Sequence, residues 1–134
     1  MERCPGCNAR LRGRVVCARC QADLTMLVHS EQAAEAWLAT AMEYLATGEL
    51  TRCISALQLA LALNKTQLAF VFRDFLIAQQ TQHVVNLLAQ KQILAAKQVL
   101  YSMRGLFAYS NSLQKLNAFS DYLLLNGTDN KSDL

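Results

Sequence analysis

Two pairs of cysteines near the start of the chain have the spacing of a metal site. Cys4 and Cys7 form one C-x-x-C pair, and nine residues later Cys17 and Cys20 form a second. Each pair can turn two thiolates toward one point about 2.3 Å away, and two facing pairs complete the tetrahedral sulfur coordination of a structural zinc ion. We therefore predict one zinc ion per chain, bound by these four cysteines.

The segment around the cysteines repeats itself after 13 residues. The pattern C-x-x-C-x-A-x-L occurs twice, first over residues 4–11 and then over residues 17–24. Two equal knuckles related by an approximate twofold axis would place Leu11 and Leu24 as apolar lids over the metal, with Val15 and Val16 as a short strand between them.

Residues 3–24 resemble the short zinc ribbons that begin or end many bacterial proteins. Such ribbons commonly carry glycine after the second cysteine of each pair, whereas this chain has Asn8 and Gln21. A segment of roughly 25 residues buries too little apolar surface to fold alone, and metal binding worth on the order of 10 kcal/mol would fold it. The alternatives are a rubredoxin-like iron site and a thiol–disulfide switch, although no thioredoxin-like strand and helix flank either pair.

The remainder of the chain has the composition of packed helices. Of 134 residues, 53% are apolar and 17% are charged, with one proline and five glycines. The apolar runs fall far short of the roughly 20 residues that cross a bilayer. A secretory signal would need an apolar run close behind Met1, where the cysteine motif begins instead, so we expect a soluble, cytoplasmic protein without membrane contact.

Residues 34–64 carry the pattern of a helical hairpin. Trp37, Ala41 and Tyr44 share one helix face, Gly48 supplies a turn, and the opposing face of a second helix is Leu50, Cys53, Leu57, Ala60 and Leu61. This stretch resembles a tetratricopeptide repeat. In that register Cys53 occupies a position where the family usually has alanine, so we interpret it as a small buried apolar residue.

A weaker second unit follows after a shift of 43 residues, with Leu50, Cys53 and Leu57 matched by Ile93, Ala96 and Leu100. The long period predicts a third helix over about 66–89, a fourth over 93–103, a break at Gly105 and a capping helix over about 112–125.

The predicted fold class is therefore mainly α: about five helices in tetratricopeptide-like hairpins behind a small Cys4 zinc ribbon. Its parts are the ribbon at 1–28, the helical domain at 31–125 and a flexible polar tail at 126–134. Two repeat units leave both ends of a stack open. The remedy would be a homo-oligomer, or packing of the ribbon on the first helix through Leu24, Met26, Leu27 and Val28.

The tetratricopeptide resemblance implies a protein-binding groove. The groove positions of the first helix correspond to Glu35, Leu38, Met42 and Leu45. The Lys and Asn side chains that clamp a C-terminal carboxylate in some members are absent there. An apolar groove suits an amphipathic helix or an apolar peptide, unless the third helix or a second subunit covers it.

The formal charge of +3 lies entirely within residues 1–30, which hold five arginines against Glu2 and Asp23. Arg10, Arg12 and Arg14 alternate, which would aim all three to one side of a strand. They could meet an acidic protein surface or nucleic acid. The module has no aromatic residue for base stacking, and the remaining chain is neutral, which disfavours nucleic acid.

No pattern of catalytic residues is present. His29 and His83 lie far apart in the sequence, and neither stands in a motif with a carboxylate or a nucleophile. We expect a non-enzymatic adaptor, scaffold or assembly factor that binds a partner protein through the groove and the ribbon. The alternatives are a nucleic-acid-binding zinc-ribbon regulator and an accessory protein for redox chemistry or metal handling.

Overall fold

The computed structural model describes residues 1–132, with side chains through Asn126. The helices are α1 (Thr25–Ala46), α2 (Leu50–Leu63), α3 (Gln67–Ala89), α4 (Ile93–Ser102), the 3-10 helix η1 (Arg104–Tyr109) and α5 (Asn111–Ser132). No strand occurs within 1–132, which confirms the mainly α fold class. Helix α5 extends into the range of the predicted polar tail, 126–134; residues 133–134 lie outside the described part, and the flexibility of the tail stays a prediction.

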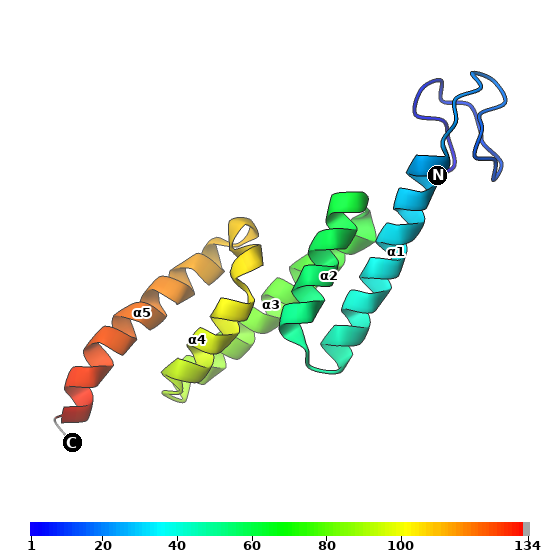
Figure 1. Cartoon of the computed structure of the whole chain (residues 1–134). Helices are drawn as coiled ribbons and strands as arrows, with labels where there is room; N and C mark the ends of the chain where they lie inside the picture. Colours follow the sequence, from blue (N-terminus) through cyan, green and yellow to red (C-terminus); the bar gives the residue numbers. More distant parts are fainter. Residues whose placement is uncertain (133–134) are drawn as a thin grey trace.

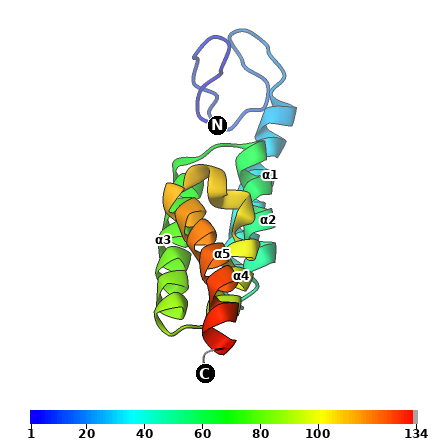
Figure 2. The same ribbon diagram turned by 90° about the vertical axis from the view of Figure 1, so that its left-hand side faces the viewer.

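The elements form an elongated array rather than a ball. Figure 1 shows the cysteine module at the free end of α1 and the end of α5 at the opposite extreme, and Figure 2 shows the same separation from the side. Helix α1 packs on α2, α3 on α4, and α4 on α5. Among the helices of the described part, none is long and apolar enough to cross a bilayer.

The two hairpins repeat each other after 43 residues in their backbone as well as in sequence. Glu49 N donates to Tyr44 O and Gln92 N to Leu87 O, both at 2.9 Å. The turn residue has a left-handed backbone in both, with φ of 81° at Gly48 and 62° at Lys91. The second turn has lysine at a position that favours glycine, so the 43-residue repeat rather than a glycine locates it in the sequence.

One core runs through both hairpins. The buried positions Cys53, Leu57 and Ala60 of α2 correspond, at the same offset, to Ala96, Leu100 and Met103 at the second hairpin, and all six belong to one buried cluster. The prediction that Cys53 is a buried small residue is confirmed.

Helix α1 turns a different face toward α2 than the sequence pattern predicts. Its buried residues are Ala34, Leu38 and Ala41, whereas Trp37 keeps 39% of its surface exposed. Alanines at two of these positions allow α2 to approach α1 closely, and the bulky indole lies beside the contact. The expectation that Trp37 shares the inner face is therefore wrong.

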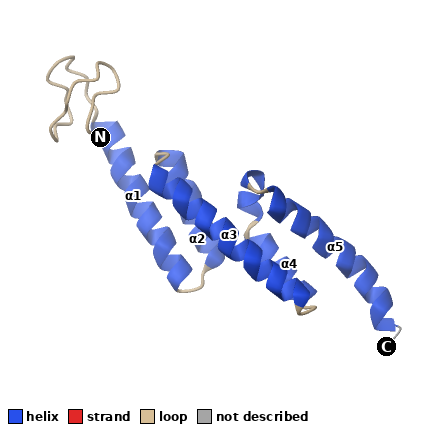
Figure 3. Ribbon diagram, turned by 180° about the vertical axis from the view of Figure 1, so that it is seen from behind, coloured by secondary structure: helices blue, strands red, loops and turns tan. Residues whose placement is uncertain are grey.

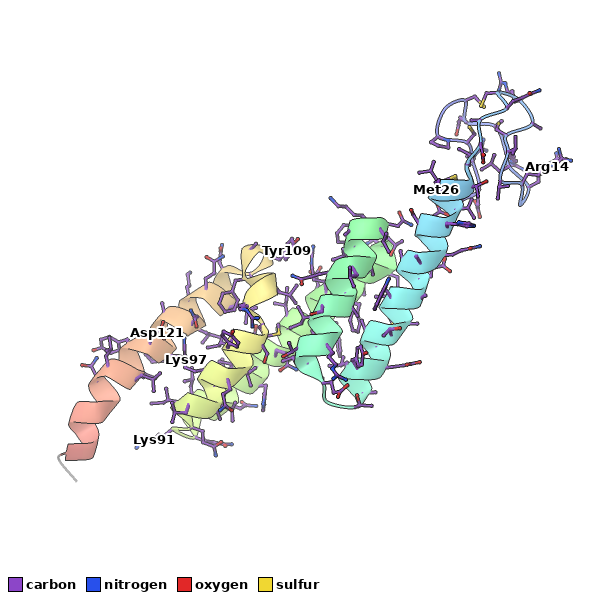
Figure 4. The ribbon with its side chains drawn as sticks, viewed as in Figure 1. Arg14, Met26, Lys91, Lys97, Tyr109 and Asp121 are labelled. Carbon is purple, nitrogen blue, oxygen red and sulfur yellow. The ribbon has the colours of Figure 1, made fainter. Side chains whose placement is uncertain are left out.

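Helix α5 occupies the position of the first helix of a third unit and caps the stack, as predicted. The Thr66 hydroxyl accepts a hydrogen bond from Ala69 N at 3.1 Å at the start of α3, and the Ser110 hydroxyl accepts one from Leu113 N at 3.2 Å at the start of α5. Lys97 of α4 lies 2.6 Å from the Asp121 carboxylate on α5 and joins the two helices (Figure 4).

Candidate metal centre

The four cysteine sulfurs of the N-terminal module come together at one point. All four Sγ atoms lie within 4.8 Å of one another, and Cys4 approaches Cys20, as Cys7 approaches Cys17, at 3.5 Å. A disulfide would need about 2.05 Å, and all four thiols are free. A tetrahedral site with 2.3 Å metal–sulfur bonds has sulfur–sulfur edges of about 3.8 Å. The predicted convergence of these cysteines is confirmed.

The two knuckles have the same backbone. Cys4 N donates to Ala9 O at 2.9 Å, and 13 residues later Cys17 N donates to Ala22 O at 3.0 Å. Single antiparallel bridges, Arg3 with Arg10 and Val16 with Asp23, repeat with the same offset. The sequence repeat is thus a structural repeat, and each close sulfur pair joins one knuckle to the other.

The turn after each cysteine pair is left-handed. Asn8 has φ of 62° and Gln21 has φ of 60°, the region in which glycine is favoured. Asparagine tolerates this conformation better than glutamine, for which it costs on the order of 1 kcal/mol. The departure from the usual ribbon pattern therefore adds strain that metal binding has to offset.

The lids form as expected, but the strand does not. Leu11 and Leu24 are buried in one cluster with Cys4 and Cys17. Val15 and Val16 are exposed, and only Val16 takes part in a bridge, so the predicted short strand between the knuckles is absent from this segment.

The arrangement of the four sulfurs favours binding of a cation. The amide of Cys20, helped by that of Arg19, lowers the pKa of Cys17 to about 6 against the opposing effect of burial, and the amides of Cys7 and Gly6 lower the pKa of Cys4. The amide of Ala22 also favours the Cys20 thiolate, but the three neighbouring thiols raise its pKa to about 12. Four thiolates this close need a divalent charge between them, and a set of four soft sulfur donors suits zinc or iron.

The arginines between the knuckles do not lie on one strand face. Arg12 and Gly13 both have positive φ, and Arg14 N donates to Leu11 O at 3.0 Å, which is the geometry of a type I′ turn. Arg10 and Arg12 line one hollow of about 430 Å³ together with Arg3, and Arg14 lines a neighbouring one. Figure 4 shows Arg14 projecting away from the module. The predicted single-sided arrangement of Arg10, Arg12 and Arg14 is corrected.

Arg10, Arg12 and Arg14 are available to an external anion, whereas Arg3 donates a hydrogen bond to Asn8 O at 3.0 Å and Glu2 shares the hollow that Arg3, Arg10 and Arg12 line. Within the described residues, no carboxylate forms an ion pair with any of the five arginines of the module. Arg3, which lies outside the alternating set of arginines, joins the hollow because the Arg3–Arg10 bridge brings the two chain segments together.

The module stands at the end of α1 and contacts the helix through the amino terminus of the chain. The amino group of Met1 lies 2.6 Å from the Glu31 carboxylate on α1, and this contact raises the pKa of the amino group. Met26 and Leu27, which we considered as packing residues, are exposed. The prediction that these two side chains pack the ribbon on the first helix is therefore wrong; of the other two residues it named, Leu24 is buried in the module's own cluster and Val28 is half-buried.

The residues predicted to bind a partner lie at different depths. Glu35 and Met42 are exposed and Leu45 is half-buried, but Leu38 is only 6% exposed because it packs in the core with α2. Leu38 is thereby removed from the groove.

A groove of about 670 Å³ lies instead between the first turn and the second hairpin, and Leu45 is its only member among those four. It is lined by Leu45, Gly48, Leu50, Gln79, Gln80, His83, Leu87, Ala95, Gln98, Val99 and Ser102. His83, which appeared isolated in the sequence, faces this groove. The members from α3 and α4 could not be found from periodicity, since they depend on how one hairpin stacks on the other.

Two contacts hold the hairpins in this arrangement. Thr51 and Ser102 hydroxyls lie 3.3 Å apart, and Gln58 Nε2 donates to Gly105 O at 3.1 Å. A Cβ on Gly105 would lie 2.5 Å from Gln58 Nε2, so glycine allows this close approach. The break predicted at Gly105 is the point where the second hairpin contacts α2.

Cys53 lies outside the metal centre, and its burial predicts a loss of folding stability at alkaline pH. Burial raises its pKa to about 11, whereas an unfolded thiol ionises near 8.5. The neutral thiol therefore favours the folded state fully below about pH 8.5, and this contribution is lost as pH rises toward 11. We expect Cys53→Ala to flatten the fall of unfolding free energy over this range in urea titrations. An unchanged pH profile would show that Cys53 ionises normally.

Comparison with known proteins yields no match: no family model, curated protein or solved structure is significantly similar to this chain.

Proposed function

We propose that this protein is a non-enzymatic adaptor or assembly factor that holds a partner protein in the groove between two tetratricopeptide-like hairpins. The observation that carries the proposal is the groove itself, about 670 Å³ in volume and open to solvent between the turn of one hairpin and the helices of the next. The matched turns and matched buried positions at an offset of 43 residues support the assignment to tetratricopeptide-like units.

The lining of this groove suits a peptide segment. Leu45, Leu87 and Val99 provide an apolar floor, and the amides and imidazole of Gln79, Gln98 and His83 stand at the same opening. Amide side chains can both donate to and accept from a peptide backbone. A partner segment with apolar side chains and an exposed backbone would satisfy both parts of the lining.

We assign zinc to the cysteine site and a second contact to the ribbon. Zinc prefers closed tetrahedral thiolate sites and has no redox chemistry, in keeping with a module that supports binding. The arginines of the ribbon lack internal carboxylate partners, so they favour an acidic region on the partner. The partner would thus combine an apolar segment for the groove with acidic side chains for the ribbon.

The groove is tested by placing negative charge at its opening. Gln79 and Gln98 are exposed, so Gln79→Glu with Gln98→Glu should leave the fold intact. We expect affinity capture of the tagged protein from its own cell lysate, treated with nuclease, to retain one stoichiometric protein identified by mass spectrometry. The double variant should recover it at least about tenfold less well, equivalent to about 1.4 kcal/mol.

Gln32→Glu with Gln90→Glu adds the same charge at exposed positions outside the groove and serves as the matched control. Equal recovery with all three proteins would remove the groove from the mechanism. Retention that disappears with nuclease would favour the nucleic-acid alternative, in which the ribbon arginines contact phosphates.

A further inference from the structure

Helix α3 is apolar on two opposite sides, but its own chain covers only one. Its 23 residues include only two charged side chains, Arg73 and Asp74, which pair with each other at 3.3 Å. On one side Ala69, Phe72, Leu76 and Val84 are buried in the core. On the other, Leu68, Val71, Phe75 and Val85 are between 41% and 58% exposed. An exposed apolar face of this kind on a helix marks a protein–protein contact.

The exposed side chains follow the spacing of a helix-pairing seam. Leu68, Val71, Phe75, Ala78, Gln82 and Val85 alternate steps of three and four residues along α3. We call these six residues the α3 stripe. This spacing keeps one narrow face toward a second helix over nearly three heptads, and it contains one polar residue, Gln82.

The stripe is complementary to itself when a second copy runs antiparallel. The register is set by placing Phe75 opposite Ala78 of the second copy. The other opposed pairs are then Leu68 with Val85 and Val71 with Gln82. Each pair sets an apolar side chain against a smaller or a polar one. Such large-to-small matching fills an interface evenly. A parallel pair would place Phe75 against Phe75 and Ala78 against Ala78, leaving one layer overfilled and the next empty.

Access to the stripe is open in this structure. Seen from behind, α3 lies in front of α2 and α4 (Figure 3), and Figure 2 shows it along one edge of the molecule. The surface of the chain is 8955 Å², about 1,900 Å² more than the roughly 7,000 Å² typical of a compact monomer of this mass. A standard interface takes about 800 Å² from each partner, which is less than half of this excess.

We infer that the protein is a homodimer in which the α3 stripes of two copies pair antiparallel across a twofold axis between Phe75 and Ala78. This inference stands apart from the proposed groove, since none of the six stripe residues lines it. The dimer would present two grooves and two ribbons, giving a partner or a pair of partners two equivalent attachment points.

Sedimentation analysis of the zinc-loaded full chain tests the pairing. We expect a reversible dimer, with Phe75→Glu and Ala78→Glu together raising the dimer dissociation constant by on the order of 100-fold or more, because four carboxylates would be buried without partners. Leu94→Glu with Ala36→Glu places the same substitutions at exposed positions outside the stripe and should leave the dimer unchanged. A monomeric natural chain, or a dimer insensitive to the stripe variant, would overturn the inference.

Cross-linking tests the direction of the pair. Chains carrying Leu68→Cys are mixed with chains carrying Val85→Cys, treated with a short bismaleimide, and analysed by mass spectrometry of the linked peptides. Antiparallel pairing predicts links between positions 68 and 85, and none between 68 and 68, which would be about 25 Å apart along the helices. Links between like positions would show a parallel pair, and a different protein bound at the stripe in place of a second copy would refute the homodimer.

Discussion

Removing the metal from the cysteine module is expected to unfold residues 1–24 while the helices stay folded. The module buries only Cys4, Leu11, Cys17 and Leu24 as its core, which is far too little to fold a segment of this length without a metal. Metal binding to such sites contributes on the order of 10 kcal/mol. The helical core contains no residue of this module, so it does not depend on the site.

Cys17→Ser and treatment with a chelator should therefore have the same result. Elemental analysis should give one zinc per natural chain and none after either change. Amide NMR signals of the module should collapse into the unfolded region, with helical circular dichroism nearly unchanged. Cys53→Ala is the matched control and should keep its zinc, because Cys53 lies outside the cluster.

Two outcomes would contradict this account of the metal. A coloured protein with bound iron would replace the zinc assignment by a rubredoxin-like site. A module that keeps dispersed signals without metal would show that its own packing folds it.

Shortening Leu57 to alanine is expected to cost about 2 to 5 kcal/mol of unfolding free energy, as for other leucines removed from a packed core. Leu57 has no exposed surface and lies in the cluster that joins α1, α2 and the second hairpin. A loss of this size is a large part of the stability of a small domain. Leu100, its counterpart in the second hairpin, should give a loss of the same order when replaced in the same way.

Trp37→Ala provides the contrast, because it removes a larger side chain from a site that is 39% exposed. We expect a loss below about 2 kcal/mol, as partial burial contributes less than full burial. Urea titration of the three variants under metal-saturating conditions measures all of these values. A larger loss for Trp37→Ala than for Leu57→Ala would show that α1 is rotated toward the tetratricopeptide register after all.

The metal site was predictable because its geometry is local. Two C-x-x-C pairs and a 13-residue repeat place the four sulfurs together, since each knuckle is built from hydrogen bonds within ten residues. Helix boundaries were predictable for the same reason: Gly48 and the runs of apolar residues mark the ends of elements through short-range interactions. The structure reproduces the predicted helices to within a few residues at α2, α3 and α4.

The binding surfaces depend on contacts between elements, which sequence periodicity does not predict. Leu38 is buried and Trp37 is exposed, which is the reverse of the prediction. A small rotation of α1 about its axis has this effect, because it changes which of its side chains face α2. The arginine arrangement changes because Arg12 lies in a turn that the alternating pattern conceals.

The groove and the α3 stripe exist only through tertiary packing. Periodicity identifies α3 as apolar. Only the packing of the core decides which side of α3 is buried and which side stays exposed. Likewise, the groove joins Leu45 to His83 and Gln98, which are distant in sequence and meet only through the stacking of the second hairpin on the first. Short-range chemistry thus determines the metal ligands and the helices, whereas the surfaces available to partners follow from how the helices rotate and stack.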